Sequence, residues 1–161
     1  MISWLQISDL HFSDETDART SNFERLFLEF CKEITDVNFV VVTGDFRHYE
    51  SKGYVQAEKF LQRVMAMLDL DITKDLFIVP GNHDVNKDRY INAKEILDNC
   101  SKLNTNKVND LLCDFSLYKQ FASKLIPTVY GNSDPTQVHV RTWRNKINIL
   151  HLKRPHKFFC I

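Results

Sequence analysis

The chain lacks a net charge, a paired-cysteine motif and a long apolar run, and each absence argues against a class of protein. Its 21 basic and 21 acidic side chains balance, so no overall field draws it to nucleic acid or to an anionic membrane. The four cysteines form no Cys-x-x-Cys pair, which argues against a zinc knuckle or a redox motif. The sequence contains no run of about 18 apolar residues and no basic segment followed by a long apolar stretch. It therefore indicates neither membrane spanning nor export. A reduced, cytoplasmic setting fits best.

Internal repeats and low-complexity linkers are also missing, which favours a single globular unit. The chain has 161 residues, of which 43% are apolar and 26% charged, values near globular averages. The end of the chain is biased, because six basic residues and no acidic one follow Asp134. A solvated, partly frayed tail explains this bias better than a nucleic-acid patch.

Three short apolar runs, at residues 2–7, 38–42 and 76–79, are typical of buried strands. Between them, residues 21–34 and 55–70 have apolar positions at helical spacing, and Ser21 with Glu24 has the spacing of a capping box. The expected buried positions are Phe23, Leu26, Phe27, Phe30 and Ile34 in the first helix, and Phe60, Leu61, Val64 and Leu68 in the second. This β-α-β-α-β order predicts an α/β fold with a parallel sheet and right-handed crossovers, whose carboxyl strand ends meet at one edge.

The remainder of the chain gives weaker signals. Residues 88–100 and 108–124 look helical, and they either cover the cleft as a lid or extend the helical layer. A strong turn signal at 131–135 precedes two strand-like segments, 138–143 and 147–152, which predict a hairpin.

Each of the three predicted strands is followed directly by a polar cluster. The clusters are Asp9-Leu10-His11, Gly44-Asp45 and Gly81-Asn82-His83-Asp84. Ligand sites of open parallel sheets are built at this edge. Carboxylate, imidazole and amide oxygen together suit manganese, iron or zinc. A carboxylate on the middle loop, such as Asp45, can bridge two ions about 3.5 to 4 Å apart, the clamp used in phosphoester hydrolysis.

Each cluster taken alone has an ordinary structural explanation. Asp-x-His after a strand can be a capping loop, and Gly-Asp is a common turn dipeptide. The third cluster is more specific, because Pro80 and Gly81 force a tight turn that projects the next side chains from a rigid strand end. The ordered combination of all three clusters is what indicates a metal site.

In this order and context the three clusters resemble the calcineurin-like metallophosphoesterase superfamily, over about residues 1–84. The resemblance implies that Asp9, His11 and Asp45 hold one divalent ion and that Asp45 and Asn82 contribute to a second. It makes His83 the catalytic histidine, which stabilises or protonates the leaving oxygen. The implied substrate is a phosphate ester, either a small molecule or a nucleic acid.

Three further residues are assigned to the site from their neighbours. Asp84 joins the catalytic group, because a carboxylate beside His83 orients that ring or braces its loop. The third residue after Asp45 is often Asp or Asn in the family, whereas here it is His48, preceded by Arg47. Either side chain is a candidate for binding a substrate phosphate, since a guanidinium matches two phosphate oxygens. A surface loop with an unpaired Arg and a packed His is an equally good alternative.

The family's later Gly-His-x-His element is absent from this sequence. His139 and His151 fall in predicted strands, where structural roles are expected, and His156 lies in a segment without resemblance. We therefore expect residues 1–152 to be the N-terminal part of a metallophosphoesterase domain with an incomplete second sheet, and 153–161 to be a non-homologous tail. The hypothesis is a truncated or frame-shifted product of a longer metallophosphoesterase.

Three functions remain open at this point. The first is a metal-dependent phosphoesterase acting on monoesters, diesters or nucleic-acid ends, impaired by the missing histidines. The second is a non-catalytic fragment that binds metal or phosphate weakly. The third is an interaction module that uses the basic, aromatic tail.

Overall fold

The computed structural model describes residues 2–15, 18–48, 50–51, 53–85, 115–130, 139–143 and 147–151. Three parallel strands form its main sheet in the order β1-β2-β3. They are β1 (Trp4–Ile7), β2 (Phe39–Val42) and β3 (Leu76–Ile78). Trp4 lies opposite Phe39, and Val40 opposite Leu76. The predicted parallel sheet is therefore confirmed, with strands slightly shorter than the apolar runs.

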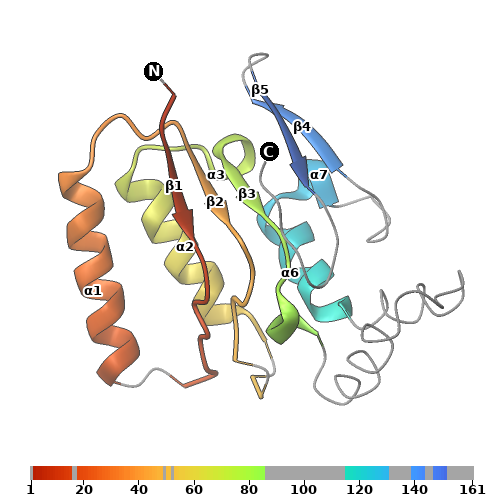
Figure 1. Cartoon of the computed structure of the whole chain (residues 1–161). Coiled ribbons are helices and arrows are strands. Elements are labelled where there is room, and N and C mark those ends of the chain that lie inside the picture. The colour runs from red at the N-terminus through yellow and green to blue at the C-terminus, as the bar shows by residue number, and fades with distance from the viewer. Residues whose placement is uncertain are drawn as a thin grey trace, which may run out of the picture.

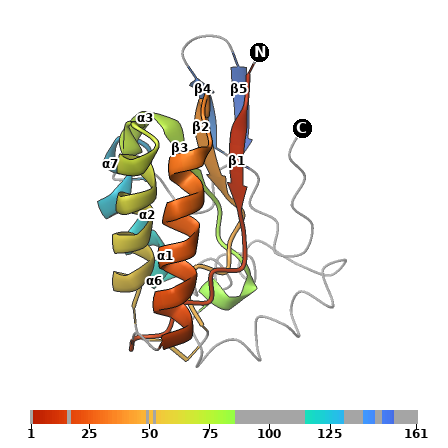
Figure 2. The same cartoon turned by 90° about the vertical axis from the view of Figure 1, so that its left-hand side faces the viewer.

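Two crossover helices, α1 (Ala18–Glu33) and α2 (Val55–Met67), cover the same face of the sheet (Figures 1 and 2). Both crossovers step across the sheet in the same direction, so their common right-handedness places both helices on one side. The short α3 (Ile72–Asp75) leads into β3, and the Asp71 side chain caps it by accepting the N–H of Thr73 at 2.9 Å.

The helical layer continues with α6 (Ser116–Leu125) and α7 (Pro127–Tyr130) (Figure 2). Helix α6 confirms part of the helix predicted at 108–124, whereas the helix predicted at 88–100 lies outside the described residues. Whether those segments form a lid therefore stays a prediction. Among the described helices, none is long and apolar enough to cross a membrane.

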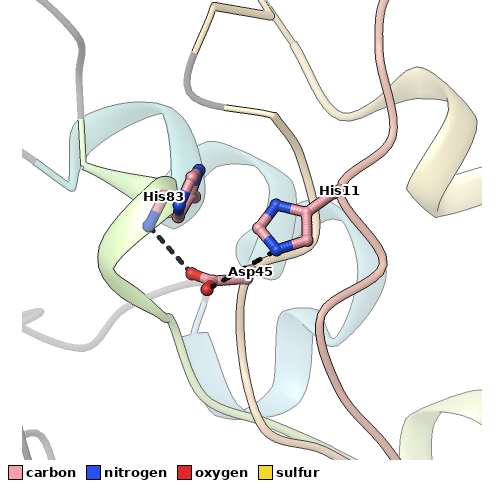
Figure 3. Close-up of side chains that lie close together, drawn as sticks. All are labelled: His11, Asp45 and His83. Carbon is pink, nitrogen blue, oxygen red and sulfur yellow. Dashed lines mark hydrogen bonds and ion pairs between the residues drawn. The ribbon is translucent and has the colours of Figure 1, made fainter.

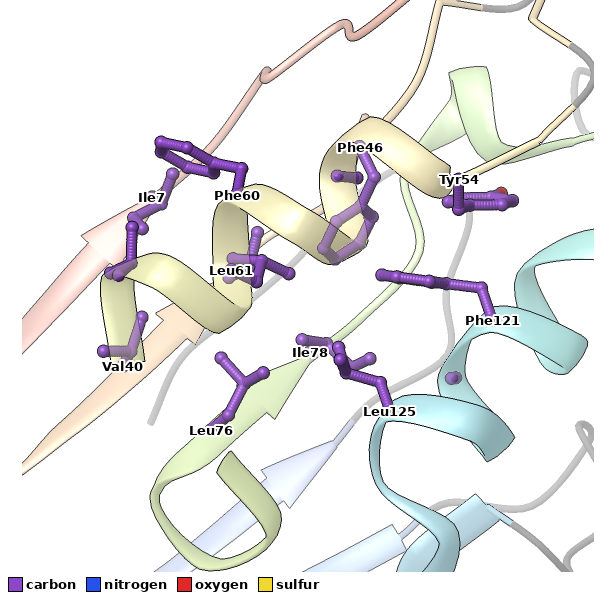
Figure 4. Packing of buried hydrophobic residues seen from close by; sticks show 14 of the residues in the cluster. Ile7, Val40, Phe46, Tyr54, Phe60, Leu61, Leu76, Ile78, Phe121 and Leu125 are labelled. Carbon is purple, nitrogen blue, oxygen red and sulfur yellow. The ribbon is translucent and has the colours of Figure 1, made fainter. Parts of the chain in front are cut away.

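The core lies between the sheet and the helices (Figure 4). Three of the four positions predicted for α2, namely Phe60, Leu61 and Val64, are fully buried. Leu68 caps the end of that helix and packs at the border of the core. Helix α6 closes the cluster with Phe121, whose ring stacks on Tyr54 with centroids 4.6 Å apart.

Helix α1 differs from the sequence prediction at its start. The helix begins at Ala18, so Ser21 and Glu24 lie inside it and form no capping box. Glu24 instead accepts a charged hydrogen bond from Arg63 of α2 at 2.8 Å, which links the two helices.

The buried face of α1 is also narrower than predicted. Leu28 and Cys31 are the buried residues, whereas Phe23, Leu26 and Phe30 are 40%, 50% and 46% exposed. The prediction that the whole apolar stripe covers the sheet is wrong. The reason is lateral position: α1 lies at the outer flank of the layer beside the edge strand β1, and α2 is its neighbour on one side (Figure 1).

The opposite face of the sheet carries a second, smaller cluster of Phe39, Val41 and Phe77. These side chains alternate with the core residues of the same strands, as the pleat requires. Trp4 stacks on Phe39 with ring centroids 6.0 Å apart and remains 56% exposed.

Strands β4 (His139–Trp143) and β5 (Ile147–His151) form an antiparallel pair with His139 opposite His151. This confirms the predicted C-terminal hairpin. Within the described residues, the pair is a sheet of its own, without ladder bonds to β1–β3.

Candidate metal centre

Three side chains from the three strand-end clusters meet at the carboxyl edge of the sheet (Figure 3). His11, Asp45 and His83 each place one potential ligand atom within 4.8 Å of the others. His11 Nε2 lies 4.0 Å from Asp45 Oδ2, and the backbone N–H of His83 donates to Asp45 Oδ1 at 2.8 Å. The two imidazole rings contact edge to face at 4.5 Å. The predicted convergence of the three clusters is therefore present.

The turns that carry Asp45 and His83 touch through two glycines. A Cβ on Gly44 would lie 2.6 Å from the Cα of Gly81, and one on Gly81 would lie 2.7 Å from Asp45 Cγ. Gly44 also has a φ of +99°, a conformation that glycine adopts without steric cost. The two turns can approach this closely only because both positions lack a side chain.

Several site residues have left-handed backbone conformations. Asp9, His11 and Asp45 have φ values of 58°, 48° and 54°. Such values are uncommon for residues other than glycine and cost conformational energy, and they concentrate at functional sites. The strain is held in place by neighbouring backbone hydrogen bonds, since His11 N donates to Asp45 O at 2.9 Å and Asp9 N to Gly44 O at 3.3 Å.

Asp84 is the residue that fastens the second and third turns together. It is fully buried, and its Oδ2 accepts the N–H of Asp45 at 2.9 Å and the N–H of Gly81 at 2.8 Å. Tyr54 donates its hydroxyl to the Asp84 carbonyl at 3.3 Å. Of the two roles expected for Asp84, these contacts favour bracing the loop.

Burial raises the pKa of Asp84 to about 7, and the nearby Asp45 carboxylate acts in the same direction, while the donated backbone N–H bonds oppose the rise. Burial also lowers the pKa of His83, although Asp45 partly offsets this effect; His11 and His48 lower it further. A neutral imidazole is therefore favoured at His83, and this is the form that ligates metals.

The remaining predicted ligands border this cluster. Asp9 is 65% exposed, with Oδ1 3.6 Å from His11 Nε2 and Oδ2 accepting from Ser8 Oγ at 2.5 Å. Asn82 is exposed at the start of the 3-10 turn η1 (Asn82–Asp84), directly before His83. The ligand roles of Asp9 and Asn82 stay predictions.

The two predicted phosphate-binding residues lie in different environments. Arg47 is only 2% exposed and donates to the carbonyls of Ser51 and, at 3.0 Å, Val85. This placement does not favour a contact between Arg47 and substrate at the metal cluster, so that role stays a prediction. The ring of His48 lies 6.1 Å from that of His83. His48 therefore flanks the cluster, where contact with a substrate remains geometrically open.

Two features of the site went beyond the sequence prediction. His83, expected to act on the leaving oxygen and not on metal, lies among the three ligand-capable side chains. Tyr54, which no motif singled out, supports the turn of Asp84 from 30 residues away. Neither signal is local in sequence, because the place of His83 depends on the contact of its turn with that of Asp45, and the Tyr54 contact depends on how the start of α2 meets the third turn.

Comparison with known proteins assigns the chain to a family. The family model described as calcineurin-like phosphoesterase matches residues 2–158, a range that continues past the boundary expected at 152; that boundary stays a prediction. The chain is 27% identical over 164 residues to the uncharacterized metallophosphoesterase-like protein YydB of Bacillus subtilis (strain 168). That alignment covers 94% of this chain and 33% of YydB, so the chain spans about a third of that relative's length. No solved structure matches significantly. The chain belongs to the calcineurin-like phosphoesterase family.

Proposed function

We propose that the chain is a metal-dependent phosphoesterase whose site lies at the carboxyl edge of β1–β3. The observation that carries this proposal is the convergence of His11, Asp45 and His83, with ligand atoms within 4.8 Å of one another. The donor set fits a divalent ion, because one carboxylate that is 13% exposed stands between two imidazoles. The left-handed backbone at two of these residues supports a functional arrangement.

In this proposal Asp9, His11 and Asp45 would hold one ion, and Asp45 with Asn82 would contribute to the other. Manganese, iron or zinc would suit these ligands. Two such ions, when bound, supply an activated water and neutralise phosphate oxygens. The protein's own contribution is to fix the shared carboxylate of Asp45, which the backbone N–H of His83 orients at 2.8 Å.

His83 is proposed to assist the departing oxygen, with Asp84 bracing the turn that carries it. A neutral imidazole next to the cluster can donate its ring N–H as a hydrogen bond to that oxygen. His48 would contact a substrate phosphate from the flank of the cluster. Small phosphate esters and nucleic-acid ends remain alternative substrates.

A second candidate is a unit that binds metal or phosphate without turnover. It requires only the ligand-capable cluster of His11, Asp45 and His83 and no further catalytic group. The first candidate requires metal binding and hydrolysis, whereas the second requires metal or phosphate binding without hydrolysis.

The test combines calorimetric titration of Mn²⁺ with hydrolysis of p-nitrophenyl phosphate and bis(p-nitrophenyl) phosphate. Asp45→Asn is the informative variant and Asp69→Asn its matched control, because both aspartates have a φ of 54°. We expect manganese binding that Asp45→Asn weakens at least about tenfold and Asp69→Asn leaves unchanged. Manganese-dependent hydrolysis that is lost in Asp45→Asn supports the phosphoesterase. Manganese binding without hydrolysis selects the second candidate, and the absence of manganese binding rejects the phosphoesterase.

A further inference from the structure

A second concavity lies outside the metal centre, at the N-terminal end of α2. Its volume is about 380 Å³, and it shares no residue with the cluster of His11, Asp45 and His83. Its polar side is formed by the start of the helix together with two side chains from the preceding loops. The residues used below are Asp14, Arg47, Gly53, Val55, Gln56 and Ala57.

The start of α2 offers this cavity unsatisfied donors. The first turn of a helix has backbone N–H groups without intrahelical acceptors, here those of Val55, Gln56 and Ala57. Tyr54 at the cap position gives them no side-chain acceptor, and no described residue supplies one. The acid of this turn, Glu58, is ion-paired with Lys124 at 2.8 Å and does not line the cavity. The positive end of the helix dipole therefore faces a concavity in which the described residues supply no cap.

Arg47 provides a second and independent observation. It lines the same cavity, is 2% exposed, and its Nε has no hydrogen-bond partner, whereas its two terminal nitrogens donate to backbone carbonyls. None of the ion pairs within the described residues involves this guanidinium. The guanidinium lies over the Tyr54 ring, 5.4 Å from its centroid, which offsets part of the cost of burying its charge. No described carboxylate pairs with it, so an anion in the adjoining cavity would lower that cost further.

We propose that this cavity is a binding site for a tetrahedral oxyanion of the phosphate class, separate from the metal centre. The helix N–H groups would supply the hydrogen bonds and Arg47 the compensating charge. The proposal stands independently of metal-dependent hydrolysis. The cavity is close along the chain to the metal centre. Phe12 and Arg47, which both line the cavity, form an isolated parallel β-bridge. Phe12 directly follows His11, and Arg47 lies two residues after Asp45.

One lining residue opposes an anion. Asp14 lines the same cavity, so removing its negative charge in Asp14→Asn should tighten phosphate binding. Unchanged or weaker phosphate binding in this variant would count against an anion site.

Gly53 offers a clean way to block the site. A Cβ placed there meets nothing within 4 Å, so a side chain can be added without disturbing the fold. Gly53→Asp adds a negative charge at the cavity, and Gly53→Asn adds nearly the same volume without charge. Inorganic phosphate is titrated in the presence of EDTA into ¹⁵N-labelled protein. We expect the amide signals of Val55, Gln56 and Ala57 to shift, and Gly53→Asp to bind about tenfold more weakly than Gly53→Asn.

Two further arms identify the source of the anion and separate the two proposed sites. Adenosine monophosphate is titrated in parallel: tighter binding than inorganic phosphate assigns the cavity to a phosphorylated compound, and equal or weaker binding assigns it to free phosphate. Asp45→Asn should leave phosphate binding in EDTA unchanged, whether or not the metal proposal holds. The inference is overturned if the wild type shows no shift, if the two Gly53 variants behave alike, or if the shifts disappear with Asp45→Asn.

Discussion

Asp45 and Asp84 each hold the turn of the other. The Asp84 carboxylate accepts the backbone N–H of Asp45 at 2.9 Å, and the Asp45 carboxylate accepts the N–H of His83, the residue directly before Asp84, at 2.8 Å. This reciprocal pair joins two turns whose aspartates are 39 positions apart in sequence. The position of the central carboxylate of the candidate site therefore depends on Asp84, which is not one of the three ligand-capable residues.

The first prediction concerns this brace. Asp84→Ala removes the acceptor for two buried N–H groups, so we expect manganese affinity to fall about tenfold or more and the free energy of unfolding to fall by about 2 kcal/mol. Asp84→Asn keeps an acceptor oxygen and should lose less in both respects. Calorimetry and urea unfolding measure the two quantities. Equal losses in the Ala and Asn variants would argue against a hydrogen-bonding role.

The second prediction is a pH dependence of stability, measured without metal in EDTA. Burial raises the pKa of Asp84 from its ordinary value of 3.8 to about 7, so between these values the folded state keeps a proton that the unfolded state releases. Stability from this group is therefore full below pH 4 and declines as pH rises toward 7. The wild type should lose stability relative to Asp84→Asn across this range and level off above it. Parallel profiles for the two proteins would contradict the prediction.

The third prediction tests the contact between the two glycine turns. Gly81→Ala places a methyl group against the Asp45 side chain and backbone, so we expect a loss of about 1 to 3 kcal/mol in unfolding free energy together with weakened manganese binding. Gly53→Ala is the control, because its methyl group meets nothing within 4 Å. Urea unfolding of both variants measures the loss of stability, and manganese titration measures the loss of affinity. A well-folded Gly81→Ala with normal affinity would show that the turns tolerate separation.

The fourth prediction concerns the core beneath the site. Phe60 is fully buried, and its ring packs against those of Phe12 and Phe27, with centroid distances of 5.3 Å and 5.4 Å. Phe60→Ala should cost about 3 to 5 kcal/mol of unfolding free energy. Phe30→Ala, on α1 and 46% exposed, removes the same atoms from a partly solvated position and should cost less than half as much. Similar losses for both would mean that α1 is more deeply packed than the structure shows.

Features encoded locally were predictable from the sequence. The three apolar runs with polar residues at their ends identified the strands, and the handedness of crossovers then brought His11, Asp45 and His83 to one edge. The buried stripe of α2 followed from helical spacing because that helix lies over the middle of the sheet.

Features that depend on lateral placement or long-range contact were not predictable. The spacing of Phe23, Leu26 and Phe30 is that of a buried face, yet spacing does not say that α1 would lie at the flank of the layer. For Arg47 the sequence left a phosphate contact and a surface loop as equal alternatives. Neither foresees its burial, because its acceptors, the carbonyls of Ser51 and Val85, meet it only after folding. Left-handed backbone at His11 has no sequence signal of its own.

Trp4, which stacks on Phe39, is a fluorescence probe for the face of the sheet opposite the crossover helices. Trp4 is half solvated and sits on the face away from the crossover helices, so its emission wavelength should respond to whatever approaches that face and not to rearrangements of the main core. With Trp143, the other tryptophan of the chain, replaced by phenylalanine, a blue shift would directly record the covering of this surface.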